Sequence, residues 1–71
     1  MAEVKVFHDR IGNTLVVWFD KPEDEYEVEE TADEVILMKN REGRVIGFEK
    51  LNFVTGDRDR TQVSFESITV N

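Results

Sequence analysis

The sequence predicts a small, mainly β fold: an antiparallel sheet of four or five strands built on a central hairpin, with at most one short helix. Two observations predict it. Short runs rich in Val, Ile and Phe alternate with polar positions, and clusters of turn residues separate these runs at short intervals. The 71 residues contain no cysteine, so no disulfide can support a small core. We expect a single domain spanning residues 1–71.

The first strand follows from alternation and turn chemistry. Residues 3–8 alternate between the two sides of a strand. Gly12 and Asn13 then give a turn signal, and Asp9 can accept hydrogen bonds from backbone N–H groups a residue or two later. We therefore expect a first strand that ends in a tight turn.

The second strand is expected in the run TLVVWFD, which follows that turn. Leu15, Val17 and Phe19 share one face, which we expect to be core. Val16 and Trp18 share the other face. A strand of this composition is expected to be partly covered on both sides.

Trp18 is the residue of greatest interest on that second face. It can cover the gap left by Gly47 or pack under the carboxy-terminal segment, and this intramolecular packing is the expected role. The alternatives are an interface with a second copy of the chain or a foreign ligand, because large aromatic side chains anchor interfaces.

The segment 21–34 holds eight of the sixteen acidic residues. Pro22 ends the second strand, and Tyr26 and Val28 then alternate with glutamates, which predicts a short strand with acids facing solvent. Charges on such a strand discourage aggregation through its edge. The alternative is a docking surface for a basic protein, whose residues would be Glu23, Asp24, Glu25, Glu27, Glu29 and Glu30. A metal site is not expected, since no calcium-loop spacing is present.

The central hairpin spans residues 35–53. Its turn is a type I turn over residues 40–43, with Gly43 as the left-handed residue of a bulge. With Asn40 opposite Arg44, the expected cross-strand pairs are Met38 with Ile46, Leu37 with Gly47, Ile36 with Phe48 and Val35 with Glu49.

The carboxy-terminal part is less regular. Residues 55–61 predict a polar loop, and residues 62–70, QVSFESITV, regain strand composition with a change of face near Glu66. A short helix bringing Phe65 and Ile68 together is the alternative for this last segment.

Charge and hydropathy exclude several classes of function. The net charge of −7 argues against direct binding to nucleic acid or anionic lipid, both of which need a basic face. The amino terminus lacks a signal-peptide pattern, and the longest apolar run has five residues where a bilayer needs about 20. We expect a cytoplasmic protein with no membrane contact.

No active site is expected, and neither is a cofactor or a metal ion. The four glycines are dispersed, so no phosphate-binding loop is present. His8 is the only available base for a serine nucleophile, and no nucleophile motif accompanies it. One enzymatic alternative is a carboxylate-dependent hydrolase using Glu49 together with Asp9 or another nearby acid.

The run of residues resembles a family of small prokaryotic proteins classed as domain of unknown function 2283. The matching residues are His8-Asp9, Asn13-Thr14-Leu15-Val16-Val17, Val35-Ile36-Leu37 and Gly43-Arg44-Val45-Ile46-Gly47-Phe48-Glu49-Lys50-Leu51-Asn52. The chain departs from the family pattern at His8, where Tyr is usual, at Asn13, where Asp is usual, and at Trp18, where a polar residue is common. The resemblance implies a compact β-rich module without an established activity.

The function expected from these observations is binding or assembly without catalysis. We expect a homodimer whose interface includes Val16, Trp18 and Tyr26. The alternative is an antitoxin-like protein that neutralises a basic partner through the acidic segment, because some proteins similar to this family are encoded beside toxin-like genes.

Overall fold

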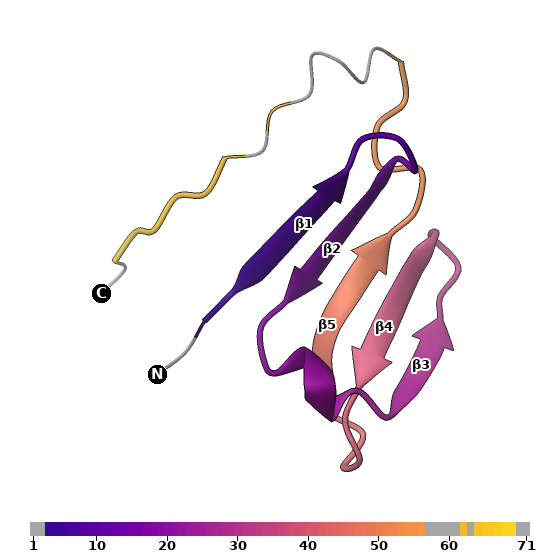
Figure 1. Ribbon diagram of the computed structural model, residues 1–71, viewed down its shortest axis with the longest axis vertical. Helices are drawn as coiled ribbons and strands as arrows, with labels where there is room; N and C mark the ends of the chain where they lie inside the picture. The colour runs from indigo at the N-terminus through magenta and orange to yellow at the C-terminus, as the bar shows by residue number, and fades with distance from the viewer. Residues whose placement is uncertain (1–2, 57–61, 63, 70–71) are drawn as a thin grey trace.

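The computed structural model describes residues 3–56, 62 and 64–69, and its strands form one open antiparallel sheet (Figure 1). The strands are β1 (Lys5–Asp9), β2 (Thr14–Trp18), β3 (Glu27–Glu30), β4 (Val35–Lys39) and β5 (Val45–Lys50). Their order in the sheet is β1-β2-β5-β4-β3. The predicted mainly β fold with a central hairpin is confirmed. Within the described residues, the only helical element is the 3-10 turn η1 (Pro22–Asp24).

The acidic segment carries the chain from β2 to the far edge of the sheet. Pro22 lacks an N–H group and so cannot continue a strand ladder. Hydrogen bonds from Asp24 N to Lys21 O (3.0 Å) and from Glu25 N to Pro22 O (3.1 Å) close the turn η1. β3, β4 and β5 then run back as a meander, which brings β5 beside β2. As predicted, the glutamate-rich strand is an edge strand.

Two turns have the predicted chemistry. Asp9 Oδ1 accepts hydrogen bonds from the N–H groups of Ile11 and Gly12, both at 3.0 Å. In the hairpin turn, Asn40 Oδ1 accepts from Arg44 N at 3.0 Å, and Gly43 has a φ of 82°. Glycine adopts this left-handed conformation without the steric cost of a Cβ atom.

The predicted register of the central hairpin is wrong beyond the first pair. Asn40 N donates to Arg44 O as expected, and Lys39 pairs with Val45. Met38, however, pairs with Gly47, because Ile46 forms a β-bulge. The bulge shifts every later pair by one residue, so the observed pairs are Leu37 with Phe48, Ile36 with Glu49 and Val35 with Lys50.

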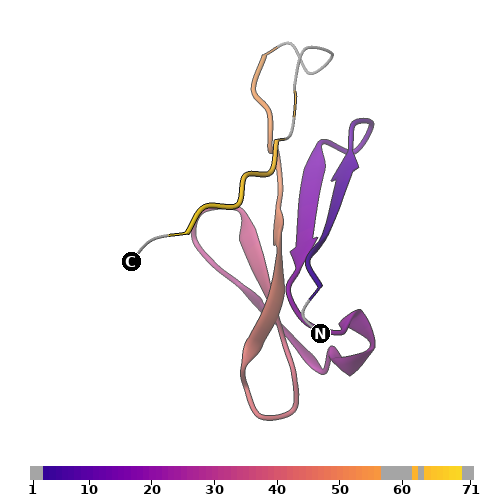
Figure 2. The ribbon, with the colours of Figure 1, turned by 90° about the vertical axis from the view of Figure 1, so that its left-hand side faces the viewer.

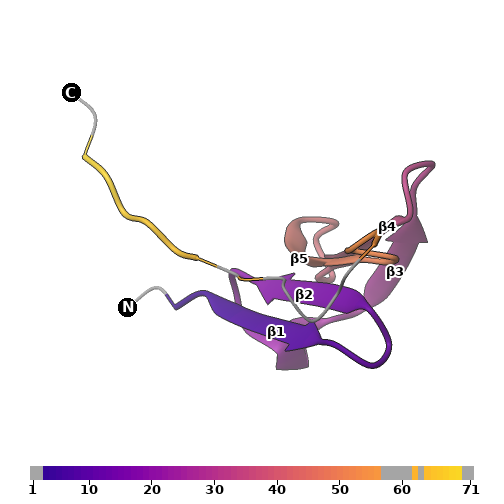
Figure 3. The same cartoon turned by 90° about the horizontal axis from the view of Figure 1, so that it is seen from above.

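The sheet is a single twisted layer, and no second layer covers it in the part of the chain that the structure describes (Figures 2 and 3). Met38 and Ile46 are the only buried side chains among the described residues, with 6% and 1% of their surface exposed. The prediction of a core face on β2 is wrong for the single chain: Leu15 and Val17 are half-buried and Phe19 is exposed. An open sheet has no opposite layer to bury such residues.

The carboxy-terminal segment is neither strand nor helix in its described residues, 62 and 64–69. The prediction of either element over 62–70 is therefore wrong there, while Val63 and Val70 lie outside the described residues. Within the described segment, Phe65 and Ile68 are exposed. Figure 3 shows the segment running away from the sheet. Most of the polar loop expected over 55–61 also lies outside the described residues.

Candidate interaction surfaces

One face of the sheet collects the interface residues expected on β2. Residues paired across antiparallel strands point to the same side, so the register defines the face. One row runs from Lys5 through Trp18, Gly47 and Met38 to Val28, and the next runs from Phe7 through Val16, Glu49 and Ile36 to Glu30. We call the surface formed by these ten residues the Trp18 face.

Trp18 covers Gly47, as the sequence predicts. A Cβ atom added to Gly47 would lie 2.7 Å from Cε3 of Trp18 and 2.7 Å from the carbonyl oxygen of Val17. Both distances are too short for a real side chain, so the indole ring occupies the space that glycine leaves. Beside this contact lie the half-buried Val16 and the buried Met38.

Tyr26 is separated from the other two predicted interface residues. It directly precedes β3, so β5 and β4 lie between it and Trp18. The residue is 61% exposed, and the Arg41 guanidinium lies 4.8 Å from the centroid of its ring. Such a cation–π contact fixes the tyrosine against the hairpin turn.

The six acidic docking residues lie in η1, at Glu25 and on β3, and together we call them the acidic margin. All six are exposed. Glu29 forms an ion pair with Lys39 across the strands. An open hollow of about 350 Å³ is lined by Glu23, Asp24, Glu25, Tyr26, Asn40, Arg41 and Glu42. Within the described residues, no group of three or more potential ligands could hold a metal ion.

The two carboxylates considered for hydrolysis do not come together. Glu49 lies on β5, whereas Asp9 ends β1 and uses Oδ1 to hold the turn after it; β2 separates the two strands. Glu49 is half-buried between Val16 and Ile36. Among the residues that the structure describes, it has no side-chain hydrogen bond or ion pair. His8 contacts Phe53 edge to face, with ring centroids 5.4 Å apart.

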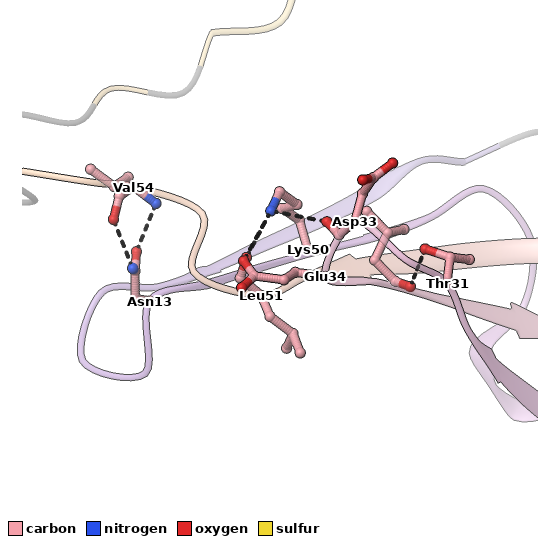
Figure 4. Close-up of polar contacts among 8 residues, drawn as sticks. Asn13, Thr31, Asp33, Glu34, Lys50, Leu51 and Val54 are labelled. Carbon is pink, nitrogen blue, oxygen red and sulfur yellow. Dashed lines mark hydrogen bonds and ion pairs between the residues drawn. The ribbon is translucent and has the colours of Figure 1, made fainter.

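Two side chains, Asn13 and Lys50, make polar contacts with residues far away in the chain, which no local sequence pattern indicates (Figure 4). The amide of Asn13 donates to Val54 O at 2.8 Å and accepts from Val54 N at 3.0 Å. Lys50 Nζ donates to Asp33 O at 3.4 Å and lies 3.6 Å from the Glu34 carboxylate. These contacts tie the end of β5 to the β1–β2 turn and to the β3–β4 turn.

The comparison with known proteins gives one match. A family model described as "Protein of unknown function (DUF2283)" matches residues 5–53, a range that includes all five strands of the sheet. No curated protein and no solved structure matches the chain. No helix among the described residues is long and apolar enough to span a bilayer.

Proposed function

Because the chain belongs to the DUF2283 family, whose function is unknown, we propose its role from the sheet itself: it is an assembly module in which a second copy covers the Trp18 face. The observation that carries the proposal is the burial of only two side chains, Met38 and Ile46, among the described residues. A sheet is stable when another layer covers its apolar face. A second copy is present wherever the chain itself is made.

Charge favours the Trp18 face as the covered surface. At a net charge of −7 two copies repel each other, so their contact must avoid the acidic margin. On the three inner strands, β2, β5 and β4, the Trp18 face carries one charge, that of Glu49, while Lys5 and Glu30 lie on its edge strands. The opposite face carries the Lys39–Glu29 ion pair and Lys50. Interface centres are depleted in charged residues and enriched in aromatic ones.

The test is the oligomeric state of the full chain by native mass spectrometry and by melting over a range of concentrations. We expect an oligomer whose melting temperature rises with concentration. Val16→Lys places a charge at the middle of the face and should weaken association by at least about ten-fold. Ile11→Lys makes the same charge change at a turn residue that is 93% exposed, and it should leave association unchanged.

A folding defect in Val16→Lys is controlled by Val16→Thr, which keeps a β-branched strand former and replaces one methyl group with a hydroxyl group. A monomer at every concentration, with a constant melting temperature, contradicts the proposal. In this proposal the chain has no catalytic role, since Asp9 is committed to its turn and lies apart from Glu49.

A second candidate is the antitoxin-like role, in which the acidic margin binds a basic protein. It is favoured by the gathering of six exposed carboxylates in η1, at Glu25 and on β3. Docking through such a surface should weaken as salt rises. Purification at low ionic strength should then retain a basic protein that high salt releases, and a Glu23→Lys, Glu25→Lys double variant should lose it. Purification of the chain alone at low salt excludes this role.

A further inference from the structure

The two edge strands of the sheet, β1 and β3, differ in how well each could pair with a further strand. The β3 edge carries Glu27, Glu29 and Glu30, so a second β3 alongside it would place glutamates near glutamates. The β1 edge carries KVFHD, with one positive charge, one negative charge and two apolar residues. Val6 and Phe7 are 42% and 56% exposed. Only the β3 edge has the charge pattern that prevents self-pairing.

The backbone groups of β1 that pair with no strand among the described residues can be assigned from the ladder. Phe19 N donates to Ile46 O, so the odd-numbered residues of β2 bond toward β5 and the even-numbered residues bond toward β1. The β1 partners of those even residues are Lys5, Phe7 and Asp9. Val6 and His8 therefore direct their N–H and C=O groups to the open edge.

An antiparallel second β1 fits these groups, and one register also pairs the charged side chains. With Phe7 opposite Phe7, Val6 of each copy lies opposite His8 of the other, and these residues exchange backbone hydrogen bonds. The same register sets Lys5 opposite Asp9 on both sides of the Phe7 pair. A shift by two residues keeps the hydrogen bonds but places Phe7 opposite Lys5 or Asp9, which removes the charge pairing.

The side chains agree with this register. Lys5, Phe7 and Asp9 alternate with Val6 and His8, so the charge pairs and the aromatic pair lie on one side of the sheet. Asp9 Oδ1 accepts both turn hydrogen bonds, which leaves Oδ2 for a lysine. Cross-strand pairs of opposite charge and of aromatic rings each stabilise a sheet.

We propose that β1 pairs with β1 of a second copy about a two-fold axis at Phe7, which joins two sheets into one continuous ten-stranded sheet. This contact uses the backbone edge of β1, whereas the Trp18-face contact covers the sheet from above, so either can form without the other although Lys5 and Phe7 border both. Together they would give a tetramer in which two ten-stranded sheets pack face to face.

The test uses cysteine cross-linking, since the chain has no cysteine of its own. Opposed residues in a non-hydrogen-bonded antiparallel pair have Cα atoms about 4.5 Å apart, within the range that a disulfide spans. Phe7→Cys should therefore oxidise to a covalent dimer at least about ten-fold faster than Val28→Cys. Val28 is the matched control, because it lies on the other edge strand and is similarly exposed, at 51%.

A second variant separates edge pairing from other contacts. Val6→Pro removes an N–H group that faces the open edge, a place where strands tolerate proline. In the Phe7→Cys background it should abolish cross-linking while circular dichroism stays unchanged. Val16→Lys should leave the cross-link intact, which distinguishes this edge contact from the Trp18 face.

Three outcomes overturn the proposal. The first is equal cross-linking of Phe7→Cys and Val28→Cys. The second is cross-linking of Phe7→Cys that Val16→Lys abolishes and that Val6→Pro leaves unchanged. This result would assign the cross-link to the Trp18 face. The third is a monomer in which the double variant Phe7→Cys, Phe65→Cys forms an internal disulfide, which assigns the β1 edge to the chain's own carboxy-terminal segment.

Discussion

Trp18 and Gly47 face each other across β2 and β5, and the indole ring fills the space above the glycine. This contact joins the amino-terminal hairpin to the meander of β3, β4 and β5. On the other side of β5, the bulge at Ile46 sets Gly47 opposite Met38, since without it the glycine would lie opposite Leu37.

Gly47→Ala should therefore destabilise the fold. Its Cβ atom would lie 2.7 Å from Trp18 Cε3, which can rotate away, and 2.7 Å from Val17 O, which belongs to the backbone and cannot. Overpacking of this kind costs about 1–3 kcal/mol of unfolding free energy. Urea denaturation, followed by the fluorescence of the single tryptophan, measures the loss.

The double variant Trp18→Leu, Gly47→Ala separates the two clashes. Relative to Trp18→Leu alone, the glycine substitution should still destabilise, because the contact with Val17 O remains. An alanine that costs nothing in either background would contradict the close approach of β2 to Gly47.

Local features of the fold could be predicted from the sequence. Alternation located the strands, and the Asp9 and Asn40 turns were predictable because each side chain bonds to backbone within four residues. The Ile46 bulge was not predictable, because a period of two fits the run Val45–Lys50 equally well in either register. The insertion of β5 between β2 and β4 depends on long-range pairing and carries no local signal.

The candidate surfaces were predictable only where a contact does not depend on long-range strand pairing. The Trp18–Gly47 contact follows from a large ring and a missing side chain, whatever the register of the hairpin. The separation of Tyr26 from Trp18 by β5 and β4 depends on strand order, which carries no local signal. The amide pairing of Asn13 with Val54 joins residues 41 positions apart, so no local pattern indicates it.

Glu29→Gln should lower the pKa of Lys39. The pKa of Lys39 is raised above 10.5, first by its hydrogen bond with Glu29; partial desolvation opposes this, and the charges of Glu29 and Glu27 add to it. A lysine with a raised folded-state pKa stabilises the fold below its unfolded pKa and loses that contribution as pH rises through the folded value. NMR titration of the Lys39 ammonium measures the shift.

Glu30→Gln is the matched control for this ion pair. It removes the same charge from the same edge strand, but Glu30 pairs with Ile36 and faces the other side of the sheet. The pKa of Lys39 should stay nearly unchanged in this variant. Above pH 10.5, the stability of the wild-type chain should fall more steeply than that of Glu29→Gln. Equal slopes would show that the pair contributes nothing to folding.

Asn13→Asp should release the segment after β5 from the β1–β2 turn. Asparagine donates to Val54 O and accepts from Val54 N, whereas an ionised aspartate can only accept. The φ of 59° at this position suits either residue, so the turn itself is preserved. Leaving Val54 O opposite a carboxylate oxygen should cost about 1–3 kcal/mol at neutral pH.

The pH dependence of Asn13→Asp tests the cause of that loss. When the substituted carboxyl group is protonated it regains a donor, so the fold binds its proton more tightly than the unfolded chain does, and the folded pKa is raised. The deficit relative to the wild-type chain should therefore be full at neutral pH and shrink as pH falls through that raised value. Amide exchange at Phe53 and Val54 should be faster in this variant than in the wild-type chain at neutral pH. The difference between the two chains should shrink in acid. A deficit that is independent of pH would assign the loss to the turn instead of to the missing donor.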